Sequence, residues 1–486
     1  MEAFVGSLND ILWSTPAIYA CLGIGLFFSL LTRFLQVRHI KEMVTLMFQG
    51  KSSEAGVSSF QALSIALSGR VGTGNIAGTA TAIAMGGPGA VFWMWAIAFI
   101  GAGSAYVEST LAQIYKVKKD GQYRGGPAYY IEKGIGIKWF AVLFAISALL
   151  AMAVLMPGVQ SNSIATGMEN AFGINKAVTG FIIIFLLGLI IFGGVKRIAS
   201  VAQITVPFMA LGYMLVALII IGLNISEVPA VISLIFKSAF GADAAFGGIL
   251  GSAIAWGVKR GIYSNEAGQG TGAHAAGAAE VSHPAKQGLV QAFSVYIDTL
   301  FVCSATAFMI LFTGMYNTVD EKNNGAVLYE GLAGVEAGPG YTQAAVETVL
   351  PGFGSGFVAI SLFFFAFTTI MAYYYIAETN VAYLFRNSKW PMFFLKLILL
   401  GATFYGAVKT AGLAWALGDV GLGLMVWLNL IAIVILTKPA VIALKDYEAQ
   451  KKQGLDPVFN STKLGIKNAE YWENGYQLES EKEKVS

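Results

Sequence analysis

Charged side chains are scarce in this chain. Of its 486 residues only 12% are Asp, Glu, Lys or Arg, and 56% are hydrophobic, whereas a soluble domain carries about 25% charged residues. This shortage excludes an ordinary soluble domain and indicates an integral membrane protein. The net charge of +3 is small and no basic cluster is interleaved with aromatic residues, so nucleic acid is not an expected partner.

Cysteine and histidine are also rare, with two Cys and three His. Cys21 and Cys303 fall in apolar runs, so we read both as small buried apolar residues without a disulfide framework. The histidines, His39, His274 and His283, lie far apart without metal-ligand spacing. No Ser sits in a nucleophile-elbow context, so we expect neither an enzyme nor an enzyme cofactor.

Long apolar runs fill most of the chain instead. About 20 apolar residues cross a bilayer as a helix. On that rule the sequence predicts eleven spans, near 11–36, 58–84, 88–115, 138–171, 177–195, 200–223, 244–280, 287–314, 342–385, 392–408 and 412–437. The N-terminus has no basic region and no cleavage site, so the first run is read as a retained span.

The Lys and Arg residues test this span count. With the N-terminus outside, the predicted inner segments carry 24 of the 31 Lys and Arg residues and the outer segments carry 4. Such an asymmetry is typical of a positive-inside topology. We therefore expect a multi-pass protein of the cell membrane with a cytoplasmic C-terminal tail, 438–486, that is solvated and partly disordered.

One polar pattern occurs twice inside the apolar runs. Residues 70–78 and 260–268 both follow Arg-x4-Asn-x-Ala-Gly, and in both a Thr stands six residues after the Asn. Arg and Asn are costly to bury in a membrane, and paired Gly-loosened breaks are typical of transporters with inverted repeats. The alternatives are that such patches serve only helix packing, or that the match is a chance one.

The two breaks lie in the second and seventh predicted spans, five spans apart. Because five is odd, the two halves would cross the membrane in opposite directions, as inverted repeats around one central site. The sequence then divides into an N-terminal span and linker, a first repeat, an outer connection, a second repeat and a tail, with bounds 1–57, 58–223, 224–243, 244–437 and 438–486.

Several longer strings resemble one family. Residues 68–78 with 86–95, 124–131, 259–268 and Asp298-Thr299 are similar to the signature of the sodium:alanine (alanine or glycine:cation) symporters. The resemblance covers about 60–400. It implies an all-α membrane protein of the leucine-transporter type, with a five-plus-five inverted repeat and one extra N-terminal helix. It also implies Na+-coupled uptake of small neutral amino acids such as alanine or glycine by alternating access.

The first break offers candidate substrate ligands. Gly74 lets backbone approach a ligand, and the freed amides around Thr73 suit a carboxylate. Asn75 carries an amide oxygen for a hard cation, and the resemblance implies a Na+ there that also touches the substrate. Across from it, Tyr263 and Ser264 of the second break would close over the substrate. The remaining candidate substrate residues are Gly78, Gln160 and Asn265.

Candidate Na+ ligands lie in two further spans. Asp298, a carboxylate inside the eighth span, is by default a functional residue; it either joins Asn75 at the ion or pairs with Lys259 or Arg260. Thr368 and Thr369 alone indicate little, since membrane Thr commonly bonds its own helix. The resemblance implies a second Na+ held by these two hydroxyls and by the carbonyls of Ser68 and Val71.

Other polar residues leave alternatives open. Gln160 and Asn162 face either the cavity or another helix, Glu266 is read as a counter-charge for Arg70 or Arg260, and for Glu108 and Glu378 solvated or structural roles are expected. A channel would favour symmetric pores over paired breaks. Within transport, coupling to H+ instead of Na+ is the alternative, because Asp298 and Glu266 could carry protons.

Overall fold

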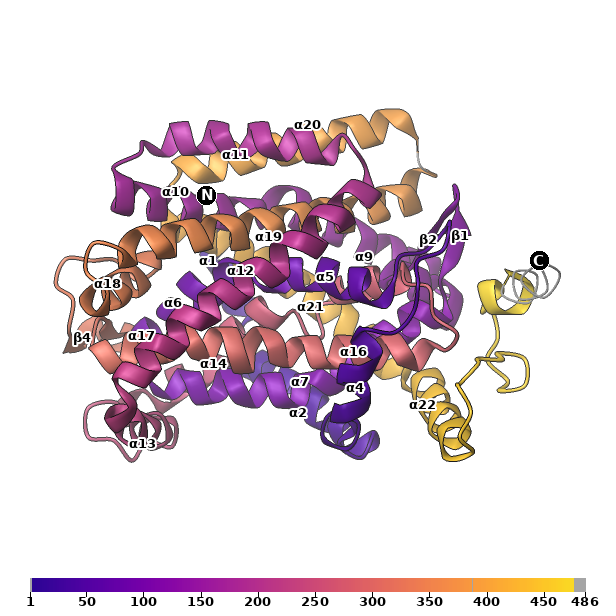
Figure 1. The fold of residues 1–486 in the computed structure, drawn as a ribbon, viewed down its shortest axis with the longest axis horizontal. Helices are drawn as coiled ribbons and strands as arrows, with labels where there is room; N and C mark the ends of the chain where they lie inside the picture. The colour runs from indigo at the N-terminus through magenta and orange to yellow at the C-terminus, as the bar shows by residue number, and fades with distance from the viewer. Residues whose placement is uncertain (1, 387, 476–486) are drawn as a thin grey trace.

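The chain folds into a bundle of long helices. The structure is a computed structural model, and it describes residues 2–386 and 388–475. Most long helices run along one direction (Figure 1). Helices α13 and α18 and strand β4 lie at one end of the bundle, and helix α22 with strands β1 and β2 lies at the other. We name these the α18 end and the α22 end.

Seven helical segments of the described chain are long and apolar enough to cross a membrane. They are α7 (Gly89–Ile114), α9 (Lys138–Leu150) continued through η3 (Ala151–Leu155) and α10 (Pro157–Phe172), α12 (Val195–Leu223), α16 (Pro284–Tyr296) continued through η6 (Ile297–Cys303) and α17 (Ser304–Thr313), α19 (Gly354–Phe385), α20 (Lys389–Val408) and α21 (Ala411–Ile435). Helices α1 (Glu2–Leu12) and α2 (Thr15–Leu31), bent by 41°, form an eighth candidate. Helix α11 (Lys176–Ile191) is apolar but shorter.

Two helices are broken at the repeated polar pattern. Helix α5 (Ser59–Arg70) ends before η1 (Gly74–Gly78) and α6 (Thr79–Gly86). Helix α14 (Leu250–Asn265) ends before α15 (Thr271–Gly277). Both predicted breaks are therefore confirmed.

Backbone conformation explains the second break. Glu266, Gly268 and Gly270 have φ values of 57°, 85° and 86°. Three left-handed residues within five positions cannot continue a right-handed helix, and two of them are glycines that adopt this conformation without a Cβ clash. The Gly-rich composition of the motif is what permits the loop.

The start of α5 follows from a local sequence signal. The Ser58 hydroxyl accepts the Gln61 N–H at 3.2 Å, and the Gln61 side chain accepts the Ser58 N–H at 3.0 Å. This capping box satisfies two amides that a helix N-terminus leaves free. It fixes where the first broken helix begins.

The remaining elements are short and lie mostly between the long helices. The helices are α3 (Leu35–Arg38), α4 (Ile40–Met47), α8 (Pro127–Tyr130), η2 (Ile131–Ile135), η4 (Ile225–Glu227), α13 (Val228–Ala239), η5 (Gly247–Ile249), η7 (Glu321–Asn323), α18 (Pro339–Val349), α22 (Thr437–Lys452) and η8 (Tyr471–Gly475). The strands are β1 (Val117–Lys119) with β2 (Gln122–Arg124), and β3 (Asn317–Asp320) with β4 (Ala326–Glu330), each pair antiparallel.

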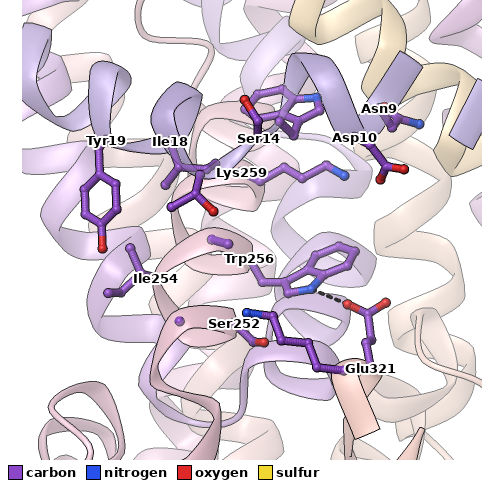
Figure 2. Close-up of a pocket in the computed structure, with 15 residues that line it drawn as sticks. Asn9, Asp10, Ser14, Ile18, Tyr19, Ser252, Ile254, Trp256, Lys259 and Glu321 are labelled. Atoms are coloured by element: carbon purple, nitrogen blue, oxygen red, sulfur yellow. Dashed lines mark hydrogen bonds between the residues drawn. The ribbon is translucent and has the colours of Figure 1, made fainter. Parts of the chain in front are cut away.

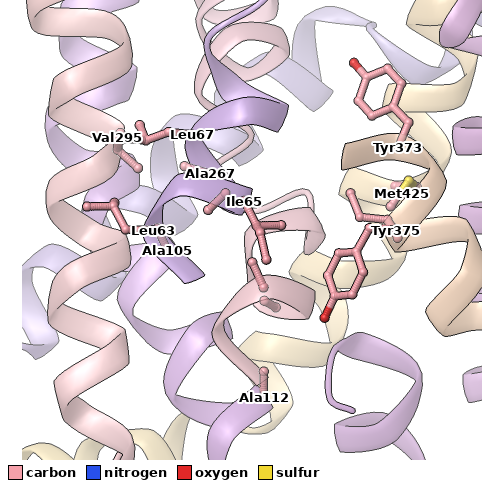
Figure 3. Packing of buried hydrophobic residues seen from close by; sticks show 14 of the residues in the cluster. Leu63, Ile65, Leu67, Ala105, Ala112, Ala267, Val295, Tyr373, Tyr375 and Met425 are labelled. Carbon is pink, nitrogen blue, oxygen red and sulfur yellow. The ribbon is translucent and has the colours of Figure 1, made fainter. Parts of the chain in front are cut away.

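The outer surface of the bundle is apolar. On α12 the exposed side chains Ile204, Phe208, Leu211 and Leu215 recur at helical spacing. A soluble helix turns such a stripe inward, so this outward stripe is what a lipid-facing helix requires. Inside, side chains of α5 and α16 pack together, and Figure 3 shows Leu63 and Leu67 beside Val295.

The C-terminal tail differs from the sequence-based expectation. Instead of a solvated, partly disordered extension, the described part after α22 is docked on the α22 end. The Phe459 N–H donates to Ser282 O at 2.9 Å, and Trp472 Nε1 donates to Gln113 O at 2.8 Å. Both aromatic rings are buried, so their burial holds an otherwise polar segment in place. Residues 476–486 of the predicted tail lie outside the described residues.

Candidate functional site

The two breaks touch each other at the centre of the bundle. A Cβ on Gly74 would lie 3.0 Å from Ser264 Cα and 3.2 Å from Ser264 Oγ. A side chain at position 74 would therefore push the second break away. Glycine at this position is explained by close approach of two backbones.

Asp298 connects the two breaks through hydrogen bonds. Its Oδ1 accepts from Asn75 Nδ2 at 2.6 Å and from Ser264 Oγ at 3.0 Å, and its Oδ2 accepts from Thr299 Oγ1 at 2.7 Å. The carboxylate is fully buried. Among the described residues no Lys or Arg lies within 4 Å of it, so its donors there are neutral. A buried carboxylate with only neutral partners is an incomplete site for positive charge.

Lys259 and Arg260, the alternative partners predicted for Asp298, form ion pairs with a different carboxylate. Lys259 Nζ lies 2.6 Å from Asp419 Oδ2, and Arg260 NH1 lies 2.7 Å from Asp419 Oδ1. Arg260 NH2 also donates to Asp419 Oδ2 at 3.2 Å, which makes the Arg260 contact bidentate. The pairing of Asp298 with Lys259 or Arg260 is therefore wrong, because Asp419 of α21 takes both cations.

Gln160 of α10 reaches the first break. Its Oε1 accepts the Thr73 N–H at 3.1 Å, and its Nε2 donates to Tyr373 OH at 3.2 Å and lies 3.5 Å from Tyr263 OH. Asn162 instead donates to the carbonyls of two residues of the α20–α21 corner, Gly406 and Lys409. Of the two open alternatives, Gln160 faces the breaks and Asn162 joins two helices.

The adjacent hydroxyls of α19 face different neighbours. A Cβ on Gly72 would collide with the Thr369 hydroxyl, so Thr369 faces the first break directly. Thr368 Oγ1 donates to Phe365 O at 2.9 Å and lies 3.9 Å from Met209 Sδ of α12. Helix α5 ends at Arg70. The carbonyls of its last turn, which include that of Ser68, therefore have no N–H of a following helical turn to accept from. Val71 is the C-cap at this point.

The other predicted substrate residues line the same region. Asn265 Nδ2 donates to Thr299 Oγ1 at 3.2 Å, and the Tyr263 ring lies 5.0 Å from the Trp415 ring. Gly78 lies close to Trp415, because a Cβ on Gly78 would be 3.6 Å from the Trp415 ring. The structure thus brings the candidate substrate residues around the two breaks.

Sequence reasoning missed several polar residues of this region. Asp419 is a carboxylate inside an apolar run, which is the signal that selected Asp298. Cys303, read as apolar, has its Sγ 3.2 Å from Ser264 Oγ and 3.3 Å from Asn75 Nδ2. The phenol of Tyr373 gave no signal, because its place beside Gln160 is set by packing.

A second polar cluster lies on the α22 side of the breaks. Arg70 NH1 donates to Gln291 O at 3.1 Å and to Ser294 Oγ. Glu266, read as a counter-charge for Arg70 or Arg260, forms no ion pair within 4 Å in the described chain. Its Oε2 accepts from Thr271 at 2.8 Å and would lie 3.1 Å from a Cβ on Gly69, the neighbour of Arg70. Of the solvated and structural roles expected for Glu108, its complete burial excludes the solvated one.

Closed layers separate these clusters from both ends. A cavity of about 950 Å³ at the α18 end reaches Trp415, whose ring covers Arg260 at 4.3 Å. A second cavity, of about 440 Å³, lies beside Lys259, which extends toward the helix carrying Asn9 and Asp10 in Figure 2. At the α22 end, Arg124 lies 3.5 Å from Glu378.

Comparison with known proteins gives consistent matches along the chain. Residues 1–461 match the sequence profile of the sodium:alanine symporter family. The chain is 77% identical over 484 residues to YrbD of Bacillus subtilis (strain 168), named as a candidate sodium/proton-dependent alanine carrier, covering 99% of this chain and 100% of YrbD. It is 64% identical over 442 residues to the sodium/proton-dependent alanine carrier protein of Bacillus sp. (strain PS3), covering 90% and 99%.

A solved structure shares the fold. A Na+-coupled sialic acid symporter, determined in a substrate-bound outward-open state, aligns over 95% of this chain and 96% of its own with a TM-score of 0.50 and 14% sequence identity. At this identity the likeness concerns the arrangement of helices alone.

Proposed function

The chain belongs to the sodium:alanine symporter family, and from this premise we propose that it imports alanine, and glycine as a second small neutral amino acid, together with Na+ by alternating access. It is a secondary transporter and not an enzyme, and Na+ acts as the coupling ion without an enzyme cofactor. The exact substrate, the site residues and the membrane topology below are our proposals.

We propose eleven membrane spans arranged as two inverted repeats. The eight apolar candidates, the shorter α11 and the two broken segments α5–α6 and α14–α15 add up to this number. The two broken segments are not among the long apolar helices because each is interrupted at its polar string. The repeats would be 58–223 and 244–437, joined by 224–243, with 1–57 before them. The excess of Lys and Arg in the predicted inner loops favours an outside N-terminus and a cytoplasmic α22 end.

The proposed substrate position lies where the breaks meet. Thr73, Gly74 and Asn75 would face the carboxylate of the amino acid, and Tyr263, Ser264 and Asn265 would face its other side. The close approach of Gly74 to Ser264 leaves no room for a large side chain in the closed structure. This supports alanine or glycine over aromatic amino acids.

The observation that carries Na+ coupling is the charge of Asp298. Its described partners are neutral, so a bound cation would complete the site. In this structure the Asn75 Nδ2 faces Asp298 and its Oδ1 accepts the Gly72 N–H at 2.8 Å, so Asn75 would have to turn its oxygen toward the ion to act as a second ligand. A second Na+ would lie between α5 and α19, with Thr369 and the Ser68 and Val71 carbonyls as its oxygen ligands. Thr368 would have to turn away from Met209 to join them. The closeness of Gly72 to Thr369 supports this second position.

Two closed layers support alternating access. Trp415 with the Arg260–Asp419 pair separates the breaks from the α18 end. At the other end, Asn380 lies 3.0 Å from His274 Nε2. For a substrate to pass, each layer has to open in turn.

Uptake by proteoliposomes tests this function. Labelled alanine should accumulate with an inward Na+ gradient and not without it. Asp298→Asn should raise the Na+ concentration for half-maximal uptake by about tenfold or more, whereas the exposed Asp10→Asn should behave as the wild type. Uptake that ignores Na+ and follows a pH gradient would show that H+, the alternative, is the coupling ion.

A further inference from the structure

Glu108 occupies a central position that the proposed Na+ sites do not use. It lies on α7 and is fully buried. Its Oε2 accepts the Gly270 N–H at 3.1 Å and Asn429 Nδ2 at 2.8 Å. Its Oε1 has no hydrogen-bond partner among the described residues. One carboxylate oxygen is thus held by two donors, and the other is open to a proton.

The charges around Glu108 do not balance. Arg70, Glu266 and Glu108 form one buried group, and no ion pair within 4 Å joins them in the described chain. Glu266 Oε2 would lie 3.1 Å from a Cβ on Gly69, the neighbour of Arg70. Its donor Thr271 adjoins Gly272, where a Cβ would meet Arg70 NH2. Arg70 therefore compensates Glu266 first, which leaves Glu108 with an uncompensated negative charge.

Other titratable groups near α7 do not supply the missing charge. The elements packed against this part of α7 contribute Tyr130 of α8, whose hydroxyl donates to Asn429, and His274 of α15, which contacts Gly270 O at 2.9 Å. Helix α2 carries no charged residue. The charged groups of α14, α16 and α22 that pair elsewhere are Lys259 and Arg260 with Asp419, Lys286 with Asp456, and Glu448 with Arg38.

We propose that Glu108 is a proton-binding site of the transport cycle. The step is a simple protonation: the carboxylate takes one H+ at Oε1 from the solution on one side and returns it to the other side after the layers exchange. No other bond forms or breaks. An unpaired buried carboxylate gains most from protonation, because the neutral form carries no charge into the membrane interior.

Glu108 is linked to the substrate position through the second break. Its acceptor oxygen holds the N–H of Gly270, and Asn429, its other donor, also donates to Gly268 O at 2.9 Å. This loop follows directly after Ser264 and Asn265. A neutral carboxyl accepts these hydrogen bonds less strongly than a carboxylate. Protonation would therefore loosen the loop that closes over the substrate, and by reciprocity substrate binding would change proton affinity.

Proton movement during alanine influx tests this inference, which rests on the transport function proposed above. Proteoliposomes are prepared with equal Na+ concentrations on both sides and a pH-sensitive dye in the lumen, and alanine is then added to the outside solution. The wild type should acidify the lumen as alanine enters. Glu108→Gln keeps an acceptor for Gly270, and its ratio of protons to alanine should fall at least about tenfold. The exposed control Glu54→Gln should keep the wild-type ratio.

Binding provides a second measurement in case Glu108→Gln does not transport. In detergent, the Kd for alanine at constant Na+ should change with pH in the wild type, by up to about tenfold per pH unit for one linked proton. It should be flat for Glu108→Gln. A wild-type proton ratio or a wild-type pH slope in Glu108→Gln would overturn the proposal. Intact Na+-driven uptake without proton movement in the wild type would overturn it as well, yet leave Na+ symport standing.

Discussion

The cluster of Asp419 with Lys259 and Arg260 gives a quantitative prediction for stability. The side chains of Asp419 and Arg260 are only 5% and 2% exposed, and that of Lys259 is 13% exposed. One carboxylate therefore compensates two buried cations. Asp419→Asn leaves both cations without a counter-charge, whereas Lys259→Met leaves the bidentate Arg260–Asp419 pair intact.

The expected losses of unfolding free energy differ accordingly. Removing one partner of a buried ion pair costs about 3–5 kcal/mol, so Asp419→Asn should lose at least that much. Lys259→Met should lose about 1 kcal/mol, because the remaining pair is neutral overall. The double variant should recover part of the Asp419→Asn loss, since only one cation then lacks a partner.

Unfolding in mixed detergent micelles, followed by circular dichroism, measures these differences. Asp10 is a matched control, because it is an exposed acid at the same end of the bundle, and Asp10→Asn should change the free energy by less than about 0.5 kcal/mol. Equal losses for Asp419→Asn and Lys259→Met would refute the charge argument. So would an Asp419→Asn loss as small as that of the control.

Three further predictions concern the second ion position and the tail. Thr369→Val should raise the Na+ requirement of uptake more than it weakens alanine affinity at saturating Na+; equal changes in both would contradict a second Na+ there. Trp472→Ala should destabilise the docked tail by about 3–5 kcal/mol and speed its proteolysis, unlike the exposed control Leu455→Ala. Burial holds the pKa of His283 below its ordinary value, and the His283 hydrogen bond lowers the pKa of Asp446. Both groups then bind fewer protons when folded than when unfolded, so the docked tail should weaken as pH falls below about 6.5, and His283→Gln should flatten this dependence.

The breaks and most helices could be predicted because their signals are local. Apolar runs of membrane length and a polar, Gly-rich string at 70–78 and 260–268 are visible without any tertiary contact. Gly74 and Ser264 could be assigned to the predicted site for the same reason, because each directly precedes the repeated Asn of its motif. Local backbone chemistry was sufficient there.

Partners across the fold could not be predicted. Asp419 stands more than 150 residues from Arg260 in sequence, and nothing local distinguishes it as the acceptor of two cations. Glu108 lies near the end of the predicted span 88–115, which α7 matches closely, and its burial comes from helices of distant sequence that pack around it. The tail looked solvated because its composition is polar, and a few aromatic side chains such as Trp472 outweigh that composition once they find a surface.

The repeated arginine shows how far an internal sequence repeat determines structure. Arg70 and Arg260 hold equivalent places in the same motif, and both precede a break and are buried. Arg260 forms a bidentate ion pair with Asp419, whereas Arg70 donates to the neutral oxygens of Gln291 and Ser294. The motif therefore repeats the break but not its electrostatics. Opening toward the α18 end has to separate the Arg260–Asp419 ion pair or move it as a unit. Arg70 forms no ion pair within 4 Å among the described residues. Because Arg70 does not compensate the negative charge of Glu108, this carboxylate can bind a proton.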